Sequence, residues 1–309
     1  MKKFVLDEKR KVALILLIVT LVHSGLRFYI DTKNIYFYFL FVISNILVYK
    51  TCKLIFKDSL VSLLACIFNT FSLVAIKSSS YSIIYELCNF FILAITYFHA
   101  KIWRKGILKW YNLLPITLTV ILGSLTHFLF LVFFAIVYLL YCLKTLKAKK
   151  YTNFLKYQIS LLTSVLLYIT AIVCFKLPIF NYTIANFNVL FNIFKCIILI
   201  NQDFFNNLLL LFVIILGFVC YRKKCKKLKF NSQIYLFALP IIIYLFVISI
   251  FASCIEITTI LPIYSVFFIS IFYFTKKYMF EHLGNRESIF LLILFVTIFA
   301  YGSITALIF

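Results

Sequence analysis

The fold of this chain is decided by long apolar stretches such as SIFLLILFVTIFAYGSITALIF at residues 288–309, which contains no acidic or basic residue. Two further stretches have the same character, QIYLFALPIIIYLFVISIFAS at residues 233–253 and LVSLLACIFNTFSLVAI at residues 60–76. A helix needs about 20 mainly apolar residues to cross the hydrocarbon core of a bilayer. Because that core holds no water for backbone amides, such stretches are expected to cross it as helices. The sequence therefore predicts an all-α, polytopic transmembrane helical bundle.

The overall composition is incompatible with a water-soluble globular protein. The 309 residues are 65% hydrophobic, 20% aromatic and only 13% charged. So few polar side chains could not cover the surface of a soluble fold. The formal net charge of +22 comes from Lys and Arg residues that cluster in the gaps between the apolar stretches. Short basic loops mark the cytoplasmic side of a membrane protein and attract anionic lipid. We therefore expect membrane lipid, and no nucleic acid, as a partner.

The basic loops set the direction of each predicted crossing and place the N-terminus in the cytoplasm. We expect about 11 spans (10–12) in a bacterial cytoplasmic membrane. They cover residues 12–26, 35–49, 60–76, 82–99, two short spans between Lys109 and Lys144, and residues 158–175, 204–220, 233–252, 258–274 and 289–309. The stretch between Lys109 and Lys144 is too long for one crossing at about 1.5 Å per residue, and both of its ends are basic. We predict that it divides at residues 123–127.

One apolar stretch is too short to join this series. Residues 187–200 carry Lys195 near their centre, and the alternation of the basic loops leaves no room for an extra crossing. We therefore predict one interfacial helix on the outer face of the membrane. Because no linker or low-complexity tract interrupts the chain, residues 1–309 are predicted to form a single integral membrane domain.

The nine acidic residues are the scarcest polar groups, and five of them accompany basic residues on the predicted cytoplasmic side. Asp31, Asp203 and Glu256 fall at the predicted outer face, and Glu86 falls inside a span. An ionised carboxylate within a bilayer is costly, so Glu86 should face the bundle interior or water. It is either a substrate or proton site or a hydrogen-bonded structural residue.

The residues predicted near the outer face also have both functional and structural interpretations. Asp31 lies between Arg27 and Lys33, where it could act as a base near an anionic headgroup or belong to an ion-pair cluster that ends the helix. Glu256 either caps an outer turn or binds substrate. His127 could serve as a donor or an acid, or be structural. No second histidine stands at metal-ligand spacing, so we predict no metal site and no cofactor, and a divalent cation stays an open alternative.

Four stretches carry a resemblance to a known family. They are Ser79-Ser80-Tyr81-Ser82, Leu122-Gly123-Ser124-Leu125-Thr126-His127-Phe128-Leu129-Phe130, Ile200-Asn201-Gln202-Asp203-Phe204-Phe205 and Ile260-Leu261-Pro262-Ile263-Tyr264. These stretches occur in the order found in bacterial GT-C class membrane glycosyltransferases of the protein-mannosyltransferase-like kind. The chain resembles that family over roughly residues 35–280. It departs from that family in a very short first outer loop and in lacking the arginines that the family carries near Ser79 and Thr258.

The resemblance implies transfer of a sugar from a polyprenyl-phosphate carrier to an envelope glycan or protein at the outer face of the membrane. A carboxylate in the first outer loop is the family's base, so Asp31 would be the catalytic residue. Arg27, Lys33 and Lys195 would bind the phosphate. Glu86, His127 and Glu256 would bind the acceptor. The missing loop and arginines also fit a catalytically degenerate member that is a partner of other envelope-glycan proteins.

Two further functions stay open. Arg27-Phe-Tyr-Ile-Asp31, with His127 further along the chain, is also similar to exopolysaccharide or O-antigen-type repeat-unit polymerases. A transporter or lipid-linked oligosaccharide flippase is the third class. Such proteins often use helices broken by Gly or Pro and internal repeats. The chain has only six Gly and four Pro, which disfavours this class.

Overall fold

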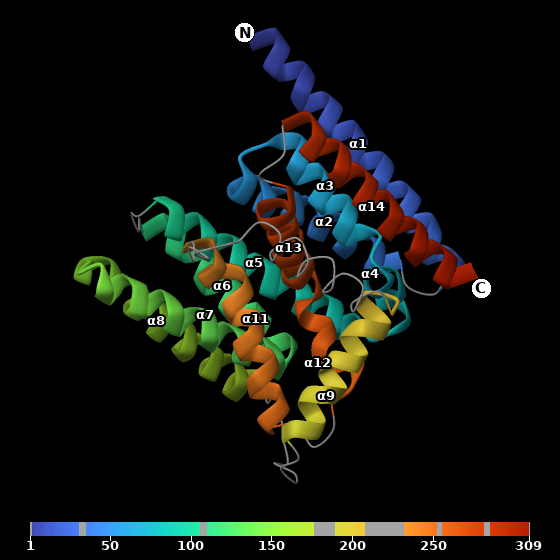
Figure 1. The fold of residues 1–309 in the computed structure, drawn as a ribbon. Helices are drawn as coiled ribbons and strands as arrows, with labels where there is room; N and C mark the ends of the chain where they lie inside the picture. Colours follow the sequence, from blue (N-terminus) through green and yellow to red (C-terminus); the bar gives the residue numbers. More distant parts are fainter. Residues whose placement is uncertain are drawn as a thin grey trace. The chain divides into compact units, whose positions relative to one another are not determined.

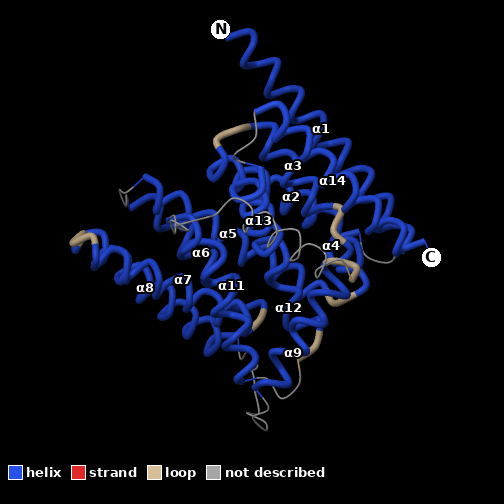
Figure 2. Tube along the Cα trace, viewed as in Figure 1, coloured by secondary structure: helices blue, strands red, loops and turns tan. Residues whose placement is uncertain are grey.

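The computed structural model describes residues 2–30, 35–105, 110–175, 189–207, 232–251, 255–280 and 285–308. Within these ranges the backbone is helical apart from short turns, and it contains no strand (Figure 2). The predicted all-α class is confirmed for this described part of the chain.

Seven of the described helical segments are long and apolar enough to cross a membrane. They are Arg10–Phe28, Tyr38–Phe56, Ile83–Trp103, Phe128–Lys147, Tyr151–Cys174, Ile257–Lys277 and Arg286–Leu307. Three shorter apolar helices, Ser59–Thr70, Leu113–Thr126 and Phe237–Phe251, coincide with other predicted spans. The predicted span at residues 204–220 lies mostly outside the described residues. The total of about 11 spans therefore stays a prediction, as does the orientation of the N-terminus.

The outward surfaces of several helices are apolar. Leu21, Leu162 and Val173 are 62%, 62% and 69% exposed. Broad exposed apolar surfaces are rare on soluble monomers, whereas contact with lipid tails accounts for them directly. These surfaces agree with a polytopic membrane protein.

The chain divides into two compact units. Unit 1 comprises Met1–Ile83, Ile197–Phe230 and Phe267–Phe309, and unit 2 comprises Ile84–Cys196 and Asn231–Val266. The single membrane domain predicted over residues 1–309 stays a prediction, because a polytopic bundle can itself contain more than one compact group of helices.

Unit 1 is built around α3. Its elements are α1 (Lys2–Ile30), α2 (Ile35–Phe56), α3 (Ser59–Thr70), α4 (Leu73–Lys77), η1 (Ser78–Ser80), η2 (Ile200–Phe204), most of α13 (Tyr264–Phe274), η4 (Thr275–Phe280) and α14 (Asn285–Ile308) (Figure 1). Helix α3 packs against α1, α2 and α14. Asp58 is its N-cap, and the Asp58 side chain accepts hydrogen bonds from the amides of Leu60 and Val61.

The predicted span at residues 60–76 is not one continuous helix. Helix α3 ends at Thr70, and α4 begins at Leu73 after Ser72, whose hydroxyl accepts from the amide of Ala75 at 3.3 Å. Serine and threonine side chains can bond to nearby backbone groups and so compete with a helix. The polar residues Asn69, Thr70 and Ser72 therefore turn a predicted single helix into two.

The core of unit 1 is aromatic. Phe68 of α3 is fully buried, and its ring centroid lies 4.4 Å from that of Phe299 and 5.3 Å from that of Phe268. Phe204 of η2 joins the same group through Phe268, at 5.7 Å. Such ring pairs add to the stability that apolar burial provides. The core thus joins segments that lie far apart in the sequence.

Unit 2 contains α5 (Ile83–Lys105), α6 (Trp110–Thr126), α7 (Phe128–Lys147), α8 (Tyr151–Phe175), α9 (Val189–Leu199), α11 (Ser232–Phe251), α12 (Ile257–Ile260) and η3 (Leu261–Ile263), apart from a few terminal residues (Figure 1). Helix α6 packs against α7 and α8, and α7 packs against α11. The predicted division at residues 123–127 is confirmed, because α6 ends at Thr126 and His127 is the N-cap of α7.

Buried polar contacts tie the helices of unit 2 together. His99 of α5 and Tyr157 of α8 are joined by a hydrogen bond between the imidazole Nε2 and the phenol oxygen. Lys144 of α7 lies over the ring of Trp103, with its ammonium 3.5 Å from the ring centroid. Within a bilayer such contacts satisfy polar groups that lipid cannot, so they select how the helices pair.

Candidate functional site

Arg27 is a buried cation at the end of α1 in unit 1, with only 1% of its side chain exposed. Its Nε donates to the carbonyl oxygen of Ala75 at 3.1 Å, and its Nη2 donates to the same oxygen at 2.5 Å. Nη2 also donates to the hydroxyl of Ser78. The guanidinium carbon lies 4.2 Å from the centroid of the Phe41 ring. Because the last carbonyls of a helix lack intrahelical partners, Arg27 both caps α4 and holds the end of α1 beside it.

Three further polar side chains gather near this point, where α4 contacts η2. Burial raises the pKa of the Asp203 carboxyl, and the positive charge of Lys77 opposes part of that rise. Burial also raises the pKa of Tyr81, and the Asp203 carboxylate adds to the effect. These effects place Lys77 and Tyr81 within electrostatic reach of Asp203. We refer to Arg27, Lys77, Tyr81 and Asp203 as the Arg27–Asp203 cluster.

A π-helix, Ile200–Phe204, carries Asp203 into this position. π-Helical turns are rare and are frequent at functional sites. The following Asn206 and Asn207 have positive φ angles of 47° and 65°, a conformation that Asn adopts more readily than most side chains. The amide of Asn207 donates to the carbonyl of Asn201 at 2.8 Å, and the Asn201 side chain donates to that of Asn207 at 3.2 Å. The asparagines thus close the turn that presents the carboxylate.

The cluster has the chemistry of a phosphate-handling site. Guanidinium and ammonium groups form strong, charge-assisted hydrogen bonds with phosphate. A carboxylate whose pKa is raised is a better base than an ordinary one. Asp31 and Lys33, the predicted base and a predicted phosphate ligand, lie outside the described residues. In the sequence they follow Arg27 by four and six positions.

Glu86 lies in unit 2, in the first turn of α5, and is 1% exposed. The hydroxyl of Tyr264 donates to its Oε2 at 3.3 Å. One turn further on, Asn89 donates to the hydroxyl of Ser265 at 3.0 Å and accepts from the Ser265 amide at 3.2 Å. A carboxylate is also favourable near a helix N-terminus. Glu86 therefore has a structural partner, and its predicted role in substrate binding stays a prediction.

His127 lines a cavity of about 160 Å³ in unit 2, together with Tyr85, Thr258, Thr259 and apolar side chains of α7 and α11. Its Nδ1 accepts from the amide of Leu129 at 3.1 Å, which caps α7, and its ring centroid lies 5.3 Å from that of Tyr85. Burial lowers the pKa of His127, which favours a neutral imidazole. With Nδ1 accepting, the proton of the neutral ring is assigned to Nε2.

Glu256 and Lys195 also belong to unit 2. Glu256 is exposed just before α12, and its Oε2 accepts from the Thr258 hydroxyl at 3.4 Å. The turn of Glu256 and the cap of α7 therefore contribute to one cavity. Lys195 is half-buried on α9. That helix is fixed to α11 by Asn192, whose side chain donates to the Ser249 carbonyl at 3.1 Å.

Lys77, Tyr81 and Asp203 were not among the predicted site residues. Two signals pointed to them. Asp203 is one of the few acids outside the predicted cytoplasmic loops, Lys77 lies just before the Ser79–Ser82 stretch, and Tyr81 lies within it. Only the contact between α4 and η2 brings these distant segments together. In the described part of the chain, no group of three or more His, Cys, Asp or Glu side chains is placed to hold a metal ion.

Comparisons of the chain with protein-family models, with curated proteins and with solved structures found no match.

Proposed function

We propose that this protein transfers a sugar from a polyprenyl-phosphate carrier to an envelope glycan or protein at the outer face of a bacterial cytoplasmic membrane. The observation that carries the proposal is the Arg27–Asp203 cluster, in which two cations and a carboxylate lie at the ends of apolar helices. The predicted topology places these ends on the outer side. Arg27 also supplies a guanidinium beside η1, close to the point where the resembled family carries an arginine.

The proposed reaction requires a base and a stabilised leaving group. The carboxylate of Asp203 or Asp31 accepts the proton of an acceptor hydroxyl, whose oxygen attacks the anomeric carbon of the sugar. The bond from that carbon to the phosphate oxygen breaks, and its electron pair leaves with the polyprenyl phosphate. Lys77 and Arg27 stabilise the negative charge of this leaving group.

The test uses the purified full-length chain in vesicles that contain a radiolabelled polyprenyl-phosphate hexose and an envelope glycan extract. Release of polyprenyl phosphate and transfer of label are both measured. Removing a general base typically costs about 10²–10⁴-fold in rate, so Asp203→Asn should lower turnover by that order. Glu287→Gln, which neutralises an exposed carboxylate on α14, is the matched control.

The variants also separate the two carboxylates. Loss of turnover in Asp31→Asn, with Asp203→Asn unchanged, would assign the base to Asp31 and remove Asp203 from the mechanism. Equal turnover in both variants and the control would contradict a carboxylate base altogether.

A non-catalytic envelope-assembly protein is the second candidate. It is favoured by the internal use of two predicted site residues, because Arg27 donates to Ala75 and Ser78 and Glu86 accepts from Tyr264. For this function the wild-type chain should give no turnover in the same vesicles, and substitution of Arg27 should change stability alone.

A further inference from the structure

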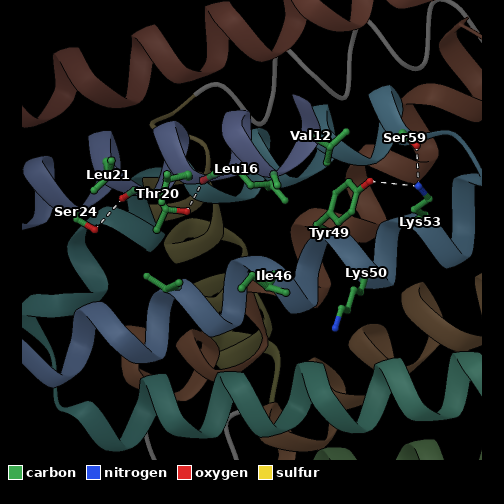
Figure 3. A pocket seen from close by; sticks show the side chains of 13 residues that line it. Val12, Leu16, Thr20, Leu21, Ser24, Ile46, Tyr49, Lys50, Lys53 and Ser59 are labelled. Carbon is green, nitrogen blue, oxygen red and sulfur yellow. Dashed lines mark hydrogen bonds between the residues drawn. The ribbon is translucent and has the colours of Figure 1, made fainter. Parts of the chain in front are cut away.

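A long groove runs between α1 and α2 in unit 1 (Figure 3). Its volume is about 600 Å³, which lies within the roughly 300–1,000 Å³ of typical ligand pockets. The walls are mainly apolar and include Val12, Leu16, Leu17 and Leu21 from α1 and Val42 and Ile46 from α2. Leu17, Leu21 and Ile46 are also 56%, 62% and 42% exposed, so the groove opens on the outer surface of the helices. In a bilayer that surface faces lipid.

The hydroxyl groups in the groove wall are satisfied within α1. Thr20 donates to the carbonyl of Leu16 at 2.6 Å, and Ser24 donates to the carbonyl of Thr20 at 2.8 Å (Figure 3). A serine or threonine that bonds back to its own helix presents little polarity to its surroundings. The middle of the groove is therefore suited to a hydrocarbon chain.

One end of the groove is cationic. Lys53 of α2 donates to the hydroxyl of Ser59 at 2.8 Å and to the phenol oxygen of Tyr49 at 3.5 Å (Figure 3). Lys50 also lines the groove, but its ammonium points away from Lys53. The apolar groove thus ends in a group of hydrogen-bond donors formed by Lys53, Tyr49 and Ser59. An anionic phosphate is complementary to this group.

The length of the groove indicates which lipid fits. From Val12 to Ser24, α1 rises about 18 Å at 1.5 Å per residue. This is close to half of the ~30 Å hydrocarbon core, which is the depth of one leaflet. An acyl chain whose headgroup sits at Lys53 would lie along the groove within one leaflet, whereas a polyprenyl chain would extend well beyond it.

We infer that this groove binds one anionic glycerophospholipid, with an acyl chain between α1 and α2 and its phosphate at Lys53, Tyr49 and Ser59. The predicted topology places this headgroup in the cytoplasmic leaflet. The headgroup end of the site is separate from the proposed sugar transfer, because Arg27 follows Val12, which lines that end, by 15 positions along α1. The lipid fills the space between the two helices and so stabilises their packing.

The first test measures binding to the headgroup site. The full-length protein is delipidated in detergent and titrated with phosphatidylglycerol, and bound lipid is counted by native mass spectrometry. We expect one tightly bound lipid, and we expect Lys53→Ala to weaken it by about tenfold, the effect of losing one charge-assisted contact. Lys147→Ala, which removes an exposed lysine at the end of α7, should leave the affinity unchanged.

The second test uses variants that fill the groove with a bulky side chain. Ile46→Trp and Leu17→Trp place a bulky ring in the groove and should abolish retention of the lipid. Ile43→Trp and Leu14→Trp are matched controls, because both residues are exposed on the same two helices but do not line the groove. These controls should bind phosphatidylglycerol as the wild type does.

Competition between ligands identifies which molecule binds in the groove. Phosphatidylcholine with identical chains should bind more weakly than phosphatidylglycerol, and glycerol 3-phosphate should not compete. Equal binding of the two lipids with Lys53→Ala unaffected would overturn the headgroup site, and competition by glycerol 3-phosphate would assign it to free phosphate. Preference for polyprenyl phosphate, or an equal effect of the control tryptophans, would overturn the phospholipid assignment.

Discussion

The interior of this helical bundle is not entirely apolar, because it contains buried ionisable side chains. Arg27 and Glu86 are each 1% exposed, and an ionisable side chain inside a membrane protein is costly unless it has partners. Arg27 donates to Ala75 and Ser78, and Glu86 accepts from Tyr264. Each side chain therefore belongs to a contact between helices, whatever further role it has.

Gly123 is a residue at which a single methyl group should matter. A Cβ there would lie 2.6 Å from ring atoms of Phe130, which is fully buried, so the ring could move only by disturbing its neighbours. We expect Gly123→Ala to lower the free energy of unfolding by about 1–3 kcal/mol through overpacking. Thermal unfolding of the purified protein in detergent measures the change.

The matched control is Gly25→Ala in α1. A Cβ at Gly25 meets nothing within 4 Å, and Ala is favoured over Gly in a helix by up to about 1 kcal/mol. Gly25→Ala should therefore leave stability unchanged or raise it. A similar loss in both variants would show that contact with Phe130 is not the cause.

His127 should make stability depend on pH. Burial lowers its pKa in the folded protein, so between the folded and unfolded pKa values the unfolded chain binds more protons. Its contribution to stability is complete above about pH 6.5 and is lost as the pH falls through 6.5 toward the folded pKa. His127→Asn retains an N-cap acceptor but cannot titrate.

We therefore expect the thermal midpoint of the wild type to fall more on acidification from about pH 7.5 to 5.5 than that of His127→Asn. The comparison cancels the contributions of the other titrating groups. Identical pH profiles would assign the whole dependence to those groups.

Among the secondary-structure elements, α4 depends most on contacts beyond its own sequence. A helix of five residues is too short to be stable alone. Ser72 caps its N-terminus, and Arg27 from α1 binds a carbonyl of its last turn. The element that carries Lys77 toward Asp203 is therefore held in place by the end of another helix.

Arg27→Ala should accordingly lower the free energy of unfolding by about 1.5–3 kcal/mol, the usual value for hydrogen bonds to a charged group. Arg27→Lys should lower the free energy of unfolding by less, because it keeps the positive charge. It should still lower it, because Lys lacks the planar guanidinium that reaches both Ala75 and Ser78. Thermal unfolding in detergent is the measurement.

Lys77→Ala is the comparison for that prediction. Lys77 is partly exposed, and surface substitutions usually change stability by less than about 0.5 kcal/mol. An equal loss in Lys77→Ala and Arg27→Ala would mean that charge, and not the contact with α4, accounts for the effect.

For the whole molecule, the main prediction concerns orientation in the membrane. Basic connections are retained in the cytoplasm, which places Lys147 inside and Ser80 outside. Both residues are exposed. In a cysteine-free background, Ser80→Cys should react with an impermeant thiol reagent in intact cells, and Lys147→Cys should react only after permeabilisation. The reverse pattern would invert the topology and remove the Arg27–Asp203 cluster from the outer face.

The helix boundaries illustrate how far the sequence pattern reaches. The break before α7 was predicted because the apolar stretch is too long for one crossing and its ends are both basic. The break between α3 and α4 was not predicted. Asn69, Thr70 and Ser72 differ little from polar residues that other spans tolerate, and the ending of α4 depends on Arg27, which is 48 residues away from its partner Ala75.

The candidate site was predictable only in part, for a related reason. Arg27 and the scarcity of acids were visible in the sequence, whereas the approach of Asp203 to Lys77 depends on the contact of η2 with α4. Composition and the positions of charges were enough to predict apolar membrane helices, because the cost of exposing backbone and charge to lipid is a local property of each segment. Which polar side chains lie close together was decided only by the tertiary structure, because those contacts depend on the packing of helices that are far apart in the chain.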